Sequence, residues 1–305
     1  MYNKEPLIFD DLFVQTPKDT TDSTNTAIRE QTDKRNKLND LSGKEWIQET
    51  KSFFFQKGLG SNSKAAKYEK MHPAPFSFTD VSKLLRFFTK RGGKVLDPFL
   101  GVGSTIKACL EMGREGFGIE LSEKWCEITK RRLKEECNYE IDNEHLIVGD
   151  SRNLLNYFEP ESFDFIVTSP PYWKILNKDK DYKAMERINN GYDISYSNGN
   201  RLDLGNVESY QKFLEELVDI FFKCHVVLKK DKYMCVVVSD FRHKSEFVPY
   251  HADLFYKLTN PELEKRFSLL GIKILIQNAK KLYPYGYPFS YVENIHHQYI
   301  LVLKK

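Results

Sequence analysis

The pattern of apolar and polar positions becomes regular at Val81. From there on, short apolar runs alternate with longer stretches in which apolar residues recur every three or four positions. This alternation predicts an α/β fold, in which a mostly parallel sheet carries helices on both faces. The clearest helices are expected at residues 122–136 and 208–228. Seven strands are expected, at residues 94–97, 115–120, 145–148, 163–168, 233–239, 272–277 and 298–303. The last two leave no room for a crossover helix between them, so the final strand should run antiparallel.

The same pattern divides the chain into an arm and a domain. Residues 14–45 are poor in large apolar groups and rich in Thr, Asp, Asn and Lys, so residues 1–52 are expected to form a mobile N-terminal arm. Residues 53–305 should form the main domain. Within it, residues 174–206 are crowded with Asn, Asp, Gly, Lys and Tyr and predict a long loop at the functional end of the sheet.

Composition narrows the class of protein. The chain has 305 residues, of which 41% are hydrophobic, enough for one substantial core. Its apolar runs are far shorter than the roughly 20 residues of a membrane span, and its first residues lack the features of a secretory signal. We therefore expect a cytoplasmic protein without a membrane partner. The five cysteines never occur as C-x-x-C and indicate free thiols, so no metal is expected. A net charge of +3 neither demands nor excludes nucleic acid.

The first chemical motif is D-P-F-L-G-V-G-S-T at residues 97–105, which follows the first expected strand and opens a helix. Gly101 and Gly103 permit a tight turn close to a ligand, and the helix N-terminus supplies N–H donors. A dinucleotide site would read G-x-G-x-x-G, and that third glycine is missing. Glu120 ends the second strand, where it could bind ribose hydroxyls, and Asp150 follows the third, where it could accept from an adenine amino group. Three successive strand ends therefore predict a nucleotide-like cofactor.

The second motif is T-S-P-P-Y-W at residues 168–173, directly after the fourth strand. Two prolines remove backbone donors, so the turn offers mainly acceptors, the Ser169 hydroxyl and the Pro170 carbonyl. Acceptors suit an aromatic amine, whose lone pair is delocalised into the ring until its N–H bonds are held out of plane. Tyr172 and Trp173 offer flat faces on which a base can stack.

With these residues the chain resembles a known family, the amino-group DNA methyltransferases, which carry a D-P-F-x-G-x-G-[ST]-T loop and an [SND]-P-P-[YFW] tetrad. Residues 69–76 also look like the family's H-P-A-x-F segment, and residues 296–302 like its closing strand. The resemblance covers residues 53–303. It implies a Rossmann-like class I methyltransferase fold, S-adenosylmethionine as methyl donor, and transfer to the amino nitrogen of adenine or cytosine in DNA.

The resemblance also assigns residues. The expected catalytic residues are Ser169, Pro170, Pro171 and Tyr172. The expected cofactor-binding residues are His72, Pro73, Phe76, Asp97, Pro98, Phe99, Gly101, Gly103, Ser104, Thr105, Glu120, Leu121, Asp150 and Thr168.

The choice of base follows from the tetrad. Ser-Pro-Pro-Tyr preceded by Thr is most familiar in cytosine-N4 enzymes, whereas adenine-N6 enzymes more often begin the tetrad with Asp or Asn. We therefore favour N4 of cytosine and keep N6 of adenine as the alternative. Cytosine-C5 chemistry would need a nucleophilic cysteine, usually in a Pro-Cys pair, and the chain has no such pair.

The order of the motifs departs from many relatives with this tetrad. His72, Asp97 and Ser169 occur in that sequence, and no dedicated recognition region follows the closing strand. Specificity should then come from the N-terminal arm, from the 174–206 loop or from another polypeptide, and we favour the loop.

Two other interpretations of the function stay open at this point. The tetrad recognises a planar amine or amide, so an RNA guanine amine or a protein glutamine amide is a rival acceptor, and a non-catalytic binding subunit is a second rival. DNA is the expected partner of a bacterial, archaeal or phage-encoded protein, and a companion restriction endonuclease is left open.

Overall fold

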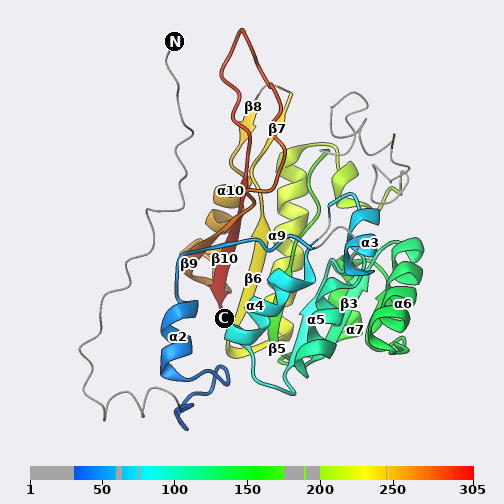
Figure 1. The fold of residues 1–305 in the computed structure, drawn as a ribbon, viewed down its shortest axis with the longest axis vertical. Helices are drawn as coiled ribbons and strands as arrows, with labels where there is room; N and C mark the ends of the chain where they lie inside the picture. The colour runs from blue at the N-terminus through cyan, green and yellow to red at the C-terminus, as the bar shows by residue number, and fades with distance from the viewer. Residues whose placement is uncertain (1–30, 60–63, 75, 175–188, 190–199, 245) are drawn as a thin grey trace, which may run out of the picture.

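The computed structural model describes residues 31–59, 64–74, 76–174, 189, 200–244 and 246–305. Its centre is an eight-stranded sheet in the order β1-β9-β10-β6-β5-β2-β3-β4, with β7 and β8 forming a separate hairpin (Figure 1). The strands are β1 (Phe53–Phe55), β2 (Lys94–Asp97), β3 (Glu115–Glu120), β4 (Leu146–Val148), β5 (Phe163–Thr168), β6 (Leu228–Val238), β7 (Phe241–His243), β8 (Glu246–Val248), β9 (Ser268–Ile276) and β10 (His297–Lys304).

The sheet topology confirms the predicted fold class. All neighbours in the large sheet pair in parallel except β10, which runs antiparallel to both β6 and β9. The seven expected strands are present, although β6 and β9 begin earlier than expected, at Leu228 and Ser268. The sheet has one strand more than predicted, because Phe53–Phe55 pairs in parallel with β9.

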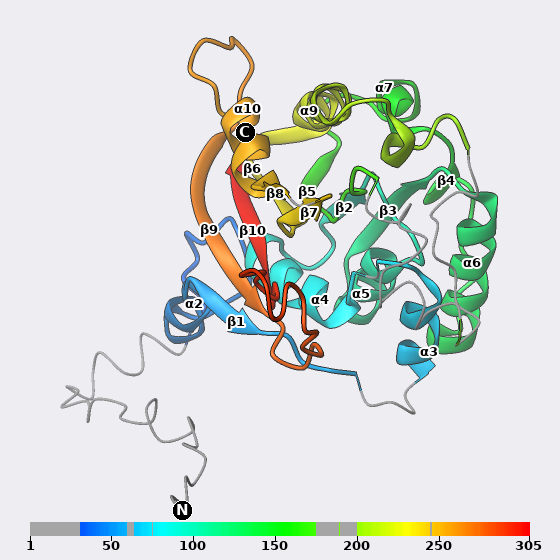
Figure 2. The same cartoon turned by 90° about the horizontal axis from the view of Figure 1, so that it is seen from above.

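Helices cover both faces of the sheet, as Figure 2 shows from above. They are α2 (Gly43–Glu49), α3 (Lys64–Met71), α4 (Phe78–Phe88), α5 (Ser104–Met112), α6 (Glu123–Cys137), α7 (Leu154–Tyr157), α9 (Tyr210–Val227) and α10 (Tyr250–Leu258). Both helices predicted from periodicity are confirmed as α6 and α9, each within two residues at either end.

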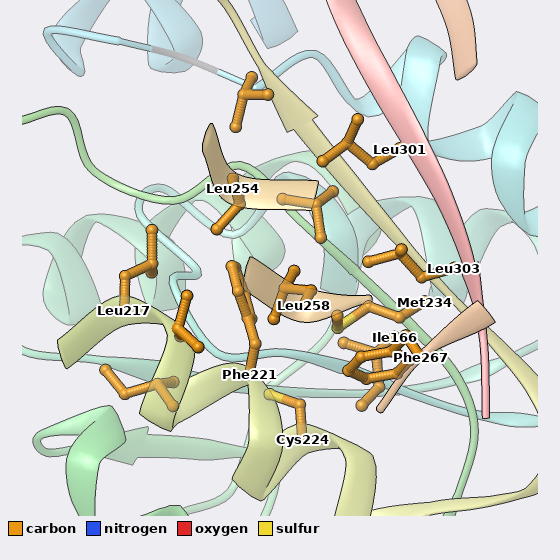
Figure 3. Close-up of a cluster of buried hydrophobic side chains, with 14 of the residues drawn as sticks. Ile166, Leu217, Phe221, Cys224, Met234, Leu254, Leu258, Phe267, Leu301 and Leu303 are labelled. Atoms are coloured by element: carbon orange, nitrogen blue, oxygen red, sulfur yellow. The ribbon is translucent and has the colours of Figure 1, made fainter. Parts of the chain in front are cut away.

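The core is divided between the two faces by the two-residue period of the strands. Leu96 and Ile166 point into one cluster with α9 and α10, which Figure 3 shows in part. Their neighbours Val95 and Phe165 point into the other cluster, with α4 and α5. Because the central strands are buried on both faces, their sequences are nearly continuous apolar runs.

Part of the expected arm packs against the domain. Residues 1–30 lie outside the described residues, but Arg86 of α4 forms ion pairs with Glu45 at 2.6 Å and Glu49 at 3.3 Å, both in α2. Asn39 is fully buried and donates from Nδ2 to the Phe87 carbonyl over 2.6 Å. A capping box between Ser42 and Glu45 begins α2.

One further finding concerns membranes. Within the described part of the chain, no helix combines the length and the apolar character that crossing a bilayer requires.

Candidate functional site

A cleft opens where the carboxyl ends of β2, β3, β4 and β5 meet. It holds about 710 Å³ of space, part of it open to solvent. Strand ends gather there because parallel strands finish at one edge of the sheet, beside the N-termini of the following helices. The lining includes eleven of the predicted residues: His72, Pro98, Phe99, Gly101, Glu120, Leu121, Asp150, Ser169, Pro170, Pro171 and Tyr172.

The two glycines of the 97–105 loop do different things. Both have the left-handed backbone that glycine tolerates, with φ of 58° at Gly101 and 77° at Gly103. Gly101 faces the cleft, and a Cβ there would stand 3.3 Å from Nε2 of His72. Gly103 faces α6 instead, where a Cβ would stand 2.5 Å from Cγ2 of Thr129. Only Gly101 therefore keeps space open for a ligand.

Asp97 lies beneath the cleft and is not part of its lining. Its carboxylate accepts hydrogen bonds from the Thr105 and Thr168 hydroxyls, both at 2.6 Å, and from the Phe99 N–H at 3.0 Å. Burial raises the pKa of Asp97 to about 6, against the opposing effect of these three donors. Asp97 thus ties the start of α5 to Thr168, the residue that precedes the Ser169-Pro170-Pro171-Tyr172 turn.

Glu120 lines the cleft at the end of β3. One carboxylate oxygen accepts from the Gly101 N–H and the other from the Ser122 N–H, each at 2.9 Å. Burial raises the pKa of Glu120 to about 7. Each oxygen still has a lone pair for a hydroxyl donor of a ligand, so the backbone fixes Glu120 in a position to accept.

Asp150 is held by a neighbour that the sequence did not single out. Arg152 donates to Asp150 at 2.9 Å, to Glu216 of α9 at 2.5 Å and to the Leu202 carbonyl at 2.7 Å. This guanidinium therefore joins the end of β4, α9 and the far end of the 174–206 segment around one rim of the cleft.

The Ser169-Pro170-Pro171-Tyr172 turn forms a further part of the cleft lining. The Tyr172 hydroxyl accepts from the Ser239 N–H at 2.9 Å, and its ring meets Phe241 and Tyr250 edge-on, with centroids 6.2 and 5.7 Å apart. Burial raises the pKa of Tyr172 to about 12, so the phenol stays protonated. Tyr172 is consequently a rigid aromatic surface.

The remaining predicted residues lie around the cleft without lining it. Phe76 packs against the apolar cluster of α4 and α5. His72, four residues earlier, lines the cleft, and its ring centroid lies 4.9 Å from that of Trp125 in α6. The predicted residues outside the lining are Pro73, Phe76, Asp97, Gly103, Ser104, Thr105 and Thr168.

Eight lining residues were missed by sequence reasoning: Ala74, Ile119, Trp125, Ser151, Arg152, Leu202, Asp203 and Leu204. Trp125 could in principle have been predicted from the sequence, because it lies in the first turn of α6, five residues after Glu120. Asp203 and Leu204 carried no local signal, since they come from the end of a long polar segment.

The two ends of the 174–206 segment lie side by side at the cleft. The Lys174 N–H donates to the Gly205 carbonyl over 3.1 Å, and the Trp173 indole N–H donates to the Val207 carbonyl over 2.9 Å. Residues 175–188 and 190–199 between them lie outside the described residues.

Comparison with known proteins gives the family. A model of DNA methylases, N6_N4_Mtase, matches residues 4–131 and 163–305. Type II methyltransferase M.MjaII of Methanocaldococcus jannaschii is 28% identical over 130 residues, which are 41% of this chain and 21% of that protein. Type II methyltransferase M.SmaI of Serratia marcescens is 49% identical over 45 residues, 15% of each chain.

A third relative has an RNA in its name. A tRNA (guanine(10)-N2)-dimethyltransferase of Pyrococcus abyssi is 28% identical over 113 residues, 35% of this chain and 33% of that protein. The matches thus span between 15% and 33% of the length of these three relatives.

Proposed function

Because the chain belongs to the DNA methylase family N6_N4_Mtase, we propose that it transfers a methyl group to the exocyclic amino nitrogen of a base in DNA. The observation that carries the proposal is that the Ser169-Pro170-Pro171-Tyr172 turn lines the same cleft as Gly101 and Glu120. The turn offers hydrogen-bond acceptors and an aromatic surface, and Gly101 and Glu120 offer space and an acceptor for a nucleoside.

S-adenosylmethionine is the cofactor of this family, and the residues of the cleft fit it. Gly101 leaves room beside His72, and Glu120 and Asp150 present carboxylates at neighbouring strand ends. Glu120 would accept from the ribose hydroxyls and Asp150 from the adenine amino group, while His72 closes the cleft over Gly101. When bound, the cofactor supplies an electrophilic methyl group on a sulfonium sulfur.

The turn then prepares the acceptor nitrogen. Ser169 Oγ and the Pro170 carbonyl accept hydrogen bonds from the two N–H groups of the target amine, which directs the nitrogen lone pair out of the plane of the base. Tyr172 holds the base from one face, and its protonated phenol takes no proton. A carbon–nitrogen bond forms as the carbon–sulfur bond breaks, and the nitrogen loses one proton to solvent. Orientation supplies most of the catalysis, because no side chain bonds to the base.

We extend the proposal to N4 of cytosine, on the strength of the Thr168-Ser169 start of the tetrad. N6 of adenine is the alternative that leaves the mechanism unchanged. An RNA guanine amine is the second candidate, supported by the match to the Pyrococcus abyssi enzyme. We further propose that residues 174–206 determine the recognised sequence, because their ends meet next to Tyr172.

The test is to identify the product. The full-length protein is incubated with S-adenosylmethionine and mixed-sequence duplex DNA, which is then digested to nucleosides for mass spectrometry. N4-methylcytosine is expected. N6-methyladenine would change the base and keep the mechanism, and methylation of RNA in place of DNA would refute the proposed substrate.

Tyr172→Ala supplies the matched variant. Removing the ring should abolish nearly all transfer, since stacking contributes about 1–3 kcal/mol per base and also positions the amine. Binding of S-adenosylmethionine, measured by calorimetry, should be retained. Tyr172→Phe keeps the ring and should retain most of the activity. Normal transfer by Tyr172→Ala would contradict the mechanism.

A further inference from the structure

The loop between β9 and β10, residues 277–296, exposes an exceptional amount of aromatic surface. Five aromatic residues alternate with other residues between Tyr283 and Tyr291. The side chains of Tyr287, Phe289 and Tyr291 are 81%, 93% and 88% exposed, and Phe289 is the most exposed large hydrophobic residue in the described part of the chain. A soluble protein rarely exposes contiguous apolar surface without a binding role.

The β9–β10 loop has a defined shape. Asn294 accepts from the Tyr283 N–H at 3.0 Å and donates to the Tyr283 carbonyl at 2.9 Å, which clamps the two sides together. At its tip Gly286 has φ of 74°, and a Cβ there would lie 2.3 Å from the Ser290 carbonyl oxygen. The Phe289 N–H donates to the Gly286 carbonyl at 2.7 Å. The aromatic rings therefore stand on a folded protrusion.

The base of this protrusion adjoins the catalytic turn. Ser239 donates from its N–H to the Tyr172 hydroxyl at 2.9 Å and from its hydroxyl to the carbonyl of His297, the first residue after the loop, at 3.3 Å. The side chain of Gln298 also hydrogen-bonds to Tyr172. From there the loop extends past β7 and β8, beyond the edge of the sheet that holds the cleft (Figure 1).

The neighbouring hairpin braces the protrusion. Arg242 of β7 donates from Nη1 to the Glu293 carbonyl over 2.8 Å. His243 of the same strand lies 4.5 Å, between ring centroids, from Trp173, which follows the catalytic turn. The hairpin therefore links the β9–β10 loop to Trp173, the residue that follows the wall on which the base would stack.

The charge of the surface favours a polyanion. Lys280 and Lys281 lie in the loop with one acidic residue, Glu293, and Arg242 adds a further cation beside it. Aromatic rings among cations are the pattern with which proteins bind exposed nucleic-acid bases and their phosphates.

We propose that the β9–β10 loop contacts duplex DNA beside the target base, with Tyr287, Phe289 and Tyr291 stacking on the bases left exposed when that nucleotide leaves the helix. This inference rests on the proposed function. Extruding a base costs a few kcal/mol in lost pairing and stacking, and aromatic rings that stack on bases contribute about 1–3 kcal/mol per base, which would offset part of that cost.

The test compares the full-length protein with the triple variant Tyr287→Ala, Phe289→Ala and Tyr291→Ala. Affinity for a mixed-sequence duplex, measured by fluorescence anisotropy, should fall about 10-fold to 100-fold, the loss expected from removing stacked rings. KM for duplex DNA should rise in parallel, while affinity for S-adenosylmethionine stays unchanged. Tyr256→Ala is the control, because this ring is 72% exposed but belongs to α10.

Phe289→Trp separates stacking from damage to the loop. It keeps a flat ring and should retain duplex affinity, whereas Phe289→Ala should lose part of it. Unchanged DNA affinity in the triple variant overturns the inference, even if methylation of DNA by the unaltered protein upholds the proposed function. The inference is also overturned if sedimentation shows that the triple variant changes its oligomeric state while its DNA affinity stays the same. That result would assign the loop to contact between copies of the chain. If the unaltered protein transfers no methyl group to DNA, the proposed function fails first and the inference falls with it.

Discussion

At the scale of single residues, three acidic side chains that look equivalent in the sequence have different surroundings. Each follows or ends a parallel strand, yet Asp97 is buried under three donors, Glu120 faces the cleft and Asp150 is paired with Arg152. A strand end thus places a carboxylate near the edge of the sheet, but its neighbours decide whether it can meet a ligand.

Asp97→Asn should affect both halves of the site although Asp97 does not line the cleft. The amide cannot accept from Thr105 and Thr168 with both of its atoms, so buried hydrogen bonds worth about 1–3 kcal/mol are lost. We expect weaker binding of S-adenosylmethionine and slower transfer, measured by calorimetry and by methyl incorporation.

Asp80→Asn is the matched control. Asp80 is also 1% exposed, with a pKa that burial raises to about 6, but it accepts from Gln56 outside the cleft. It should change thermal stability and leave cofactor affinity intact. Equal loss of cofactor affinity in the two variants would show that Asp97 acts through general stability.

Glu120 should make cofactor binding depend on pH. With a pKa raised by burial to about 7, it is protonated in acid and then accepts poorly from ribose hydroxyls. Affinity should therefore increase as pH rises through about 7 and level off above it, by up to about tenfold per pH unit. Calorimetry across this range checks the effect, and Glu120→Gln should flatten the profile. A flat profile in the unaltered protein would remove Glu120 from the binding site.

At the scale of elements, helix α6 shapes a loop to which it is not connected in sequence. Thr129 faces Gly103 and donates to the Gly101 carbonyl at 3.1 Å. Arg132, fully buried, donates to the Val102 carbonyl and the Ser104 hydroxyl at 3.0 Å, and to Glu69 of α3 at 3.1 Å. One helix therefore holds both the 97–105 loop and the segment that carries His72.

Arg132→Met should destabilise the protein and weaken cofactor binding. It leaves Glu69 buried without its cation, whereas Glu136 keeps an ion pair with Lys107 at 2.8 Å, and breaking a buried ion pair costs about 3–5 kcal/mol. Urea denaturation measures the first effect and calorimetry the second. Arg131→Met, on the exposed side of the same helix, should do neither. Cofactor affinity unchanged in Arg132→Met would limit Arg132 to a role in folding.

At the scale of the whole molecule, the main cores and the site occupy different parts of the sheet. The strands bury apolar side chains on both faces, while polar groups gather where the strands end. Asp97 and Glu120 are consequently buried at the site with no cation among the groups that shift their pKa, and this affects the stability of the whole protein.

The free energy of unfolding should fall as pH rises from about 4.5 to about 7. Burial raises the pKa of Glu69, Asp80, Asp97 and Glu120, so the folded protein binds more protons in this range than the unfolded chain. Their stabilising protons are fully bound below the unfolded pKa and lost as pH rises through the folded pKa. His225, whose pKa burial lowers, acts oppositely but is one group against four. Urea denaturation at both ends of the range tests this. Stability that rises with pH would contradict it.

The sequence by itself determined the positions of the seven principal strands along the chain, the antiparallel direction of the last one, the helices α6 and α9, and the residues of both motifs. These follow from local properties, since periodicity and turn chemistry act over a few residues. The same locality explains the missed strand, because Phe53–Phe55 is too short to show a period and depends on β9 for its pairing.

Only the tertiary structure decided which motif residues face the cleft. Asp97 and Thr168 are 71 positions apart and Arg132 and Glu69 are 63 apart, so no local pattern could reveal their contacts. Likewise, Gly101 and Gly103 look alike in sequence, and only the approach of His72 to one and Thr129 to the other distinguishes them. Contacts between distant segments form when the chain packs, and packing alone decides which groups water and ligands can reach.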